Sequence, residues 1–129
     1  MPTAVAKLHL SKRWREPGSS ARQEATIDNP DVLTELLGSL EPGERVEYYV
    51  RSPYAPTYYI REMDEAGEVV DELRVVGGGI IVRDQESFMP RSHSLRKLLD
   101  NALAREIARQ KRRKLSFLVR IFRRASASP

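Results

Sequence analysis

The densest set of chemically active residues is a basic run near the C-terminus. Lys and Arg side chains neutralise phosphates and release bound counterions, so the affinity of such a run for nucleic acid falls as salt rises. Trp14, between Arg13 and Arg15, can stack on a base, or it can pin its loop onto the core. We predict a nucleic-acid or anion-binding surface made by Trp14 and by Arg105, Arg109, Lys111, Arg112, Arg113, Lys114, Arg120, Arg123 and Arg124.

Patterns typical of catalysis or metal binding are weak. The two histidines, His9 and His93, have no paired-ligand spacing, and the serines beside His93 are explained by a helix cap. The acidic residues between Asp64 and Glu72 fit a solvated hairpin. Gly77–Gly79 is not followed by Lys-Ser or Lys-Thr, as a phosphate-binding loop requires. We therefore predict no catalytic, cofactor or metal site, and a protein that is not an enzyme. An enzyme whose active site is assembled from residues that form no linear motif stays open as an alternative.

The net charge of +4 conceals a sharp division along the chain. Residues 1–23 have a net charge of +4, residues 24–86 of −10, and residues 87–129 of +10. Such asymmetry is typical of a basic surface that meets an anionic partner, and equally of one that meets the protein's own acidic part.

Size and composition favour one small domain. A chain of 129 residues can bury its own core. It contains no cysteine, and we find neither a signal-peptide pattern nor an apolar run long enough to span a bilayer. We expect a cytoplasmic protein.

Alternating apolar and polar residues predict an α+β fold with a small antiparallel sheet of four to six strands. Tyr48 and Tyr49, like Tyr58 and Tyr59, are neighbours and must point to opposite faces, which favours packing over a stacking platform. Gly67 is expected to form a hairpin turn. The expected strands cover residues 4–10, 25–27, 46–51, 57–63, 68–76 and 79–83.

A short helix is predicted after the second strand. Asn29 can cap it, Pro30 suits its first position, and Asp31 suits the positive end of its dipole. Its apolar stripe begins at Val32, and the helix is expected to end near Glu41-Pro42-Gly43, because proline cannot continue the hydrogen-bond ladder.

A long C-terminal helix has two apolar stripes, the first at Leu95, Leu98, Leu99, Ala102 and Leu103, and the second at Leu115, Leu118, Val119 and Phe122. At about 100° per residue, Leu115 lies about 200° around the axis from Leu95, so one straight helix cannot bury both stripes on one surface. Either the helix bends or breaks near Lys111–Lys114, or its distal half packs on a partner, or the tail folds back onto the acidic body. We divide the chain into an α+β domain, residues 1–108, and a basic amphipathic extension, residues 109–129, with residues 125–129 disordered.

Three binding functions remain open. In the first, the basic helix contacts nucleic acid or a ribonucleoprotein. In the second, Leu115, Leu118, Val119 and Phe122 form the interface of an assembly subunit, with a second copy, another protein or a membrane surface as the partner. In the third, the acidic sheet inhibits another protein: the segment from Asp28 to Leu37, after the opening strand, resembles the start of some bacterial toxin-immunity proteins, a group from which the basic tail departs.

Overall fold

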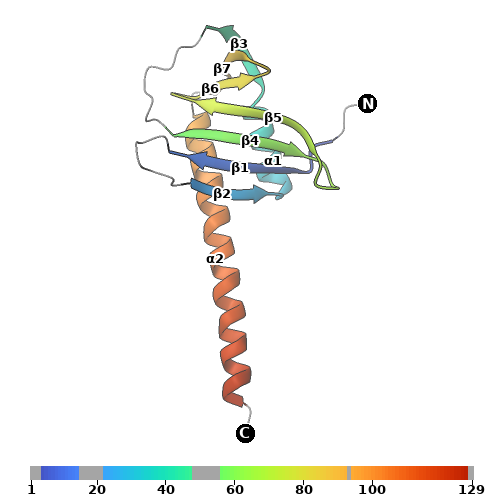
Figure 1. Ribbon diagram of the computed structural model, residues 1–129, viewed down its shortest axis with the longest axis vertical. Helices are drawn as coiled ribbons and strands as arrows, with labels where there is room; N and C mark the ends of the chain where they lie inside the picture. Colours follow the sequence, from blue (N-terminus) through green and yellow to red (C-terminus); the bar gives the residue numbers. More distant parts are fainter. Residues whose placement is uncertain (1–3, 15–21, 48–55, 93, 128–129) are drawn as a thin grey trace.

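The computed structural model describes residues 4–14, 22–47, 56–92 and 94–127. They form one seven-stranded antiparallel sheet and two helices, the α+β class that we predicted, with one strand more than the expected range (Figure 1). The strand order is β2-β1-β4-β5-β6-β7-β3. In chain order the elements are β1 (Lys7–Arg13), β2 (Arg22–Ile27), α1 (Pro30–Ser39), β3 (Pro42–Val46), β4 (Thr57–Met63), β5 (Val69–Val76), β6 (Ile80–Arg83), β7 (Glu86–Pro90) and α2 (Leu95–Ala127).

Both helices lie on the same face of the sheet (Figure 1). Alternation sends every second strand residue into the core beneath them, including Leu8 and Leu10 of β1 and Tyr58 and Ile60 of β4. Tyr58 is fully buried whereas its neighbour Tyr59 is only half-buried, as the opposite-face prediction requires. Tyr48 and Tyr49 lie outside the described residues.

Helix α1 begins where the sequence predicts. The Asn29 side chain accepts hydrogen bonds from the backbone N–H groups of Asp31 (3.0 Å) and Val32 (3.3 Å), and Pro30 is the first helical residue. The helix ends at Ser39, slightly before the expected stop, and the N–H of Leu40 donates to the carbonyl of Leu36 at 2.9 Å. Leu33, Leu36 and Leu40 are buried, so this helix docks through one stripe.

The strand predictions for residues 57–63, 68–76 and 79–83 are confirmed within a residue. The first strand is displaced toward the C-terminus, to Lys7–Arg13. The strand expected over residues 46–51 is wrong at its start, because β3 ends at Val46, and residues 48–51 lie outside the described residues. The predictions missed β3 and β7, which pair with each other at the end of the sheet.

Helix α2 runs without interruption from Leu95 to Ala127, so the break near Lys111–Lys114, one of the three alternatives left open, does not occur. The tail does not fold back either, because every side chain from 110 to 123 is exposed. Residues 125–127, expected to be disordered, continue the helix, while residues 128 and 129 lie outside the described residues. The distal half of α2 therefore projects past the edge strand β2, away from the body (Figure 1).

Candidate functional site

The first half of α2 is fixed to the sheet by its apolar stripe. Leu95, Leu99, Ala102 and Leu103 are buried against the core, and Leu98 packs beside them. This half of the helix contacts β2 and α1. The predicted first stripe is thus confirmed, and it sets the direction in which the remainder of α2 leaves the body.

Asp100 ties the same half of α2 to two strands. Its Oδ1 accepts hydrogen bonds from the ammonium of Lys12, at 2.8 Å, and from the hydroxyl of Tyr58. Lys12 also lies 5.5 Å from the ring centroid of Tyr58 and 5.1 Å from that of Trp14. Since a buried tyrosine needs a partner for its hydroxyl, this contact fixes the helix at a defined rotation about its axis.

Arg96, one turn earlier, holds the start of α2 against two connections. Its guanidinium donates to the carbonyls of Gly77 and Pro56, the latter at 3.0 Å. Two separate segments that lead into or out of strands are thereby joined to the first turn of α2. The helix therefore has polar as well as apolar anchors at its base.

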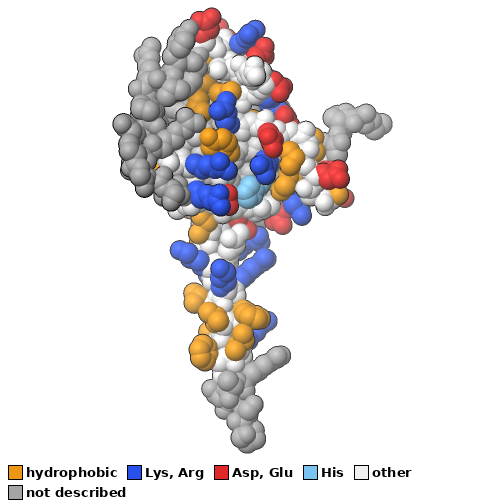
Figure 2. Space-filling model, in the orientation of Figure 1, with side chains coloured by type: hydrophobic (Ala, Val, Ile, Leu, Met, Phe, Trp, Pro, Cys, Tyr) orange, Lys and Arg blue, Asp and Glu red, His pale blue; other side chains and the backbone are white. Residues whose placement is uncertain are grey.

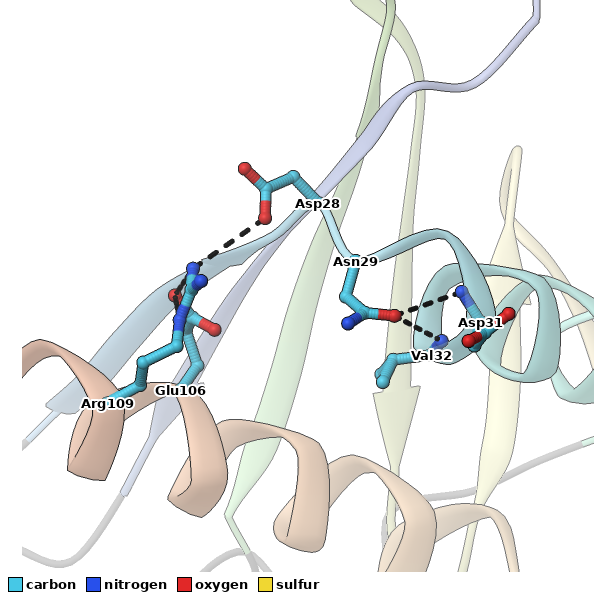
Figure 3. A network of polar contacts seen from close by, with 6 residues as sticks. All are labelled: Asp28, Asn29, Asp31, Val32, Glu106 and Arg109. Atoms are coloured by element: carbon cyan, nitrogen blue, oxygen red, sulfur yellow. Dashed lines mark hydrogen bonds and ion pairs between the residues drawn. The ribbon is translucent and has the colours of Figure 1, made fainter.

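Arg109 marks the point where α2 leaves the body (Figure 3). Its Nη2 lies 2.7 Å from Oε1 of Glu106 and 3.7 Å from Oδ1 of Asp28, which stands between β2 and α1. The hydrogen bond to Glu106, with the negative charges of Glu106 and then Asp28, raises the pKa of Arg109 above its ordinary value, against a small opposing effect of burial. Arg109 is one of the residues predicted for the anion-binding surface, and the structure gives it two carboxylate neighbours.

Beyond Arg109, residues 110–123 form what we call the distal segment. It has six basic side chains and no acidic one, and all of its residues are exposed. Figure 2 shows apolar side chains gathered along the far part of α2, with Lys and Arg between them and the body. The large apolar side chains, which we call the apolar face, are Leu115 (61% exposed), Phe117 (64%), Leu118 (48%), Val119 (48%), Ile121 (46%) and Phe122 (70%).

The apolar face is wide. At about 100° per residue, its positions cover an arc of about 200° around the helix, more than the second stripe alone would cover, because Phe117 and Ile121 extend it. Lys111 and Lys114 lie on the same side of the helix but closer to the body. Between Leu115 and Arg123, only Ser116, Arg120 and Arg123 occupy the remaining side.

Most of the predicted basic residues share the opposite side of α2. Arg105, Arg109, Arg112, Arg120 and Arg123, which we call the arginine row, lie within about 80° of one another around the axis. Arg109, Arg112, Arg113 and Arg120 also line one shallow depression on this side, together with Ser116 and Phe117. The side chain of Arg124 lies outside the described residues.

Trp14 is not brought into this row by any contact within the described part of the chain. It stands at the end of β1, half-buried, with the ammonium of Lys12 over its ring. Because Lys12 also binds Asp100, Trp14 belongs to the polar anchor of α2. This placement favours the packing interpretation of Trp14.

A group of polar side chains that the sequence did not lead us to predict lies on the sheet face opposite the helices. Arg13 stacks on Tyr59, with 4.5 Å from its guanidinium carbon to the ring centroid, and Arg61 pairs with Glu72 at 3.2 Å. These four side chains line a depression of about 400 Å³, and His9, Ser11 and Arg74 line it with them. The spacing of His9, Ser11 and Arg13 at every second residue of one strand could have predicted that they share this face. Acidic and basic side chains mix here, so this face is not uniformly acidic.

The acidic residues of the β4–β5 hairpin do not gather into one site, because they bind different groups. An Asp64 carboxylate oxygen accepts from the N–H of Glu68 at 2.9 Å within the turn, whose Gly67 has φ 84°. Asp71 and Glu62 pair with Arg83, and Glu72 pairs with Arg61. Across the described residues, no three His, Asp or Glu side chains are grouped closely enough to hold a metal ion.

No helix in the described ranges is both long enough and apolar enough to cross a bilayer. Comparisons of the chain with protein-family models, with curated proteins and with solved structures found no match.

Proposed function

We propose that this chain is a cytoplasmic, non-enzymatic binding protein that attaches to an anionic partner through the distal segment of α2. The observation that carries the proposal is that residues 110–123 are exposed throughout and contain six basic and no acidic side chains. A rigid helix that projects from a folded body presents these charges without any rearrangement of the core, which lowers the entropic cost of binding.

Nucleic acid or a ribonucleoprotein is the partner that the arginine row supports. From Arg105 to Arg123 the row is about 27 Å long, at about 1.5 Å per residue. Arginine binds phosphate through two parallel N–H donors, and contacts with several phosphates add to one another. A nucleic acid would therefore bind with an affinity that falls steeply as salt rises.

An assembly partner is the second candidate, and the apolar face favours it. Soluble proteins rarely leave a contiguous group of large apolar side chains in water unless the group contacts a partner. Leu115, Leu118, Val119 and Phe122 would pack on that partner, and their contact would persist in high salt. The two candidates therefore differ in their response to salt: high salt weakens the first contact and leaves the second in place.

Size-exclusion chromatography with light scattering tests the proposal. The full chain is compared with a chain that ends at Arg109, at low and at high salt, with absorbance recorded at both protein and nucleic-acid wavelengths. Nucleic acid that copurifies with the full chain, and that either high salt or truncation removes, supports attachment through the arginine row. An oligomer that resists salt and is dissolved by truncation supports assembly.

A matched charge control makes the test specific. Arg45→Glu with Arg91→Glu changes the net charge as much as Arg112→Glu with Arg113→Glu does, but on the exposed surface of the body. The proposal requires that only the pair on α2 weakens attachment. If both pairs have equal effects, or if the full chain binds neither a polyanion nor a partner, the distal segment is not the binding element.

A further inference from the structure

The apolar face and the basic side chains of the distal segment occupy the same stretch of α2, on different sides of the helix. Leu115, Leu118 and Phe122 lie on the same two to three turns as Arg120 and Arg123, all exposed. A partner must therefore satisfy a broad apolar arc and a positive flank together. We infer that this partner is the surface of an anionic lipid bilayer, an inference that rests on the proposed function of attachment.

The width of the apolar face favours a lipid surface over a helical protein partner. A single partner helix covers a narrow seam, whereas the apolar face spans about 200° and so amounts to half of the helix surface. A helix that lies in a bilayer interface buries such a half, with phenylalanine and leucine among the acyl chains. Phe117 and Phe122, 64% and 70% exposed, are the two aromatic side chains of this face.

Charge complementarity points the same way. Arg112 and Arg123 lie beside one edge of the apolar arc and Arg113 beside the other, at about 100° per residue. Lys111 and Lys114 stand on the apolar side itself, closer to the body, where long side chains can reach headgroups. Each basic residue near an anionic surface adds to the attraction, and the distal segment has no acid to oppose it.

A second copy of the chain is disfavoured by the same charges. Ala104, Ala108, Lys111, Leu115, Leu118 and Phe122 have the spacing of four and three residues that is typical of a two-stranded coiled coil. Arg105, Arg112 and Lys114 flank this seam, however, and the distal segment has six basic and no acidic side chains, so pairing identical helices would bring two positively charged segments together. Lys111 would also enter the seam.

Nucleic acid accounts for only one side of the distal segment. Phosphates would contact the arginine row, but the apolar face on the other side would remain in water. The centre of the apolar face is turned about 120° from the side that packs on the sheet, while Phe117 and Ile121 at its edge continue the direction of Leu99 and Leu103. The segment projects past β2, so this edge too lies beyond the body (Figure 1).

The test uses the full chain and vesicles of phosphatidylcholine alone or mixed with phosphatidylglycerol, with an oligonucleotide as a separate ligand. We expect sedimentation with the mixed vesicles and none with phosphatidylcholine alone. Leu118→Glu with Phe122→Glu should weaken vesicle binding at least about tenfold, since two charges replace inserted side chains. Val69→Glu with Val70→Glu, on the exposed end of β5, is the matched control and should leave vesicle binding unchanged.

Insertion itself is read from Phe117→Trp combined with Trp14→Phe, so that the new indole is the one tryptophan of the chain. Its fluorescence should shift to the blue with mixed vesicles and not with the oligonucleotide. Binding to the oligonucleotide without vesicle binding would overturn the lipid inference and leave the proposed attachment intact. Vesicle binding that the Leu118→Glu, Phe122→Glu variant retains in full would also overturn the inference, because charge alone would then explain it. Failure to bind either ligand would contradict both the inference and attachment to an anionic partner.

Discussion

Arg109 Nη2 lies 3.7 Å from Oδ1 of Asp28, and beyond this pair all described side chains of α2 are exposed. The pair thus marks the boundary between the part of α2 that belongs to the core and the part that projects. Asp28 immediately precedes the cap of α1 (Figure 3), so one short segment contacts both helices.

The Arg109 pair should add little to stability. Its side chains are 41% and 56% exposed, and exposed pairs contribute weakly. Because the folded pKa of Arg109 is raised, its contribution is present below the ordinary arginine pKa and is lost only as pH rises through the raised value. Arg109→Gln should therefore change the melting temperature very little, and by the same small amount at neutral and at mildly alkaline pH. A large, pH-dependent fall would contradict this assignment.

Replacing a leucine by alanine should cost stability in the first half of α2 and almost none in the distal half. Leu99 is fully buried, so Leu99→Ala should lower the free energy of unfolding by about 2–5 kcal/mol. Leu118 is 48% exposed and supports no core, so Leu118→Ala should stay within about 0.5 kcal/mol of the parent. Urea unfolding followed by circular dichroism measures both. Equal losses would mean that the distal segment packs on the body.

The hydroxyl of Tyr58 should matter to the docking of α2. Tyr58→Phe removes the donor to Asp100 but keeps the buried ring, so we expect a loss of about 1 kcal/mol. The Asp100 carboxylate is 46% exposed and can recruit water, which limits the cost. A double-mutant cycle with Asp100→Ala, which removes the acceptor, should show coupling between the two positions. Strict additivity would exclude a direct interaction.

Two glycines should respond with opposite signs to alanine. A Cβ on Gly43 would lie 2.6 Å from the carbonyl oxygen of Met89, so Gly43→Ala should cost about 1–3 kcal/mol through displacement of β3 from β7. Gly38 lies within α1 with nothing within 4 Å of an added Cβ, so Gly38→Ala should gain about 0.5–1 kcal/mol. Thermal melts of both variants provide the comparison, and a stabilised Gly43→Ala would refute the β3–β7 contact.

The β6–β7 turn offers a stabilising change. Asp84 and Gln85 have φ angles of 51° and 66°, which suit a two-residue hairpin turn but strain a side chain at the second position. Gln85→Gly should raise the free energy of unfolding by up to about 1 kcal/mol. Gly67→Ala, at φ 84° with open space around it, should lower it by a similar amount. An unstable Gln85→Gly would show that the glutamine side chain has a packing role.

These positions explain which elements could be read from the sequence. Asn29-Pro30-Asp31 predicts the start of α1 because a cap acts within one turn. Strand β4 and the Gly67 hairpin follow from alternation and a local turn signal. Strand β7 was missed because its turn, Asp84-Gln85, lacks glycine, and β3 was missed because Pro42-Gly43 follows a helix and looked like its terminator. Only pairing with β7 turns that segment into a strand.

The sequence alone determined that α2 has two apolar stripes facing nearly opposite directions and a long basic run, because helical periodicity is a local property. It could not determine whether the helix would break, fold back or continue. The tertiary structure decided this, because the Asp100, Arg96 and Arg109 contacts and the first stripe fix the rotation of α2 on the sheet. With one face committed to the core, a straight helix leaves the second stripe and Arg112, Arg120 and Arg123 of the arginine row beyond the body, exposed to a partner.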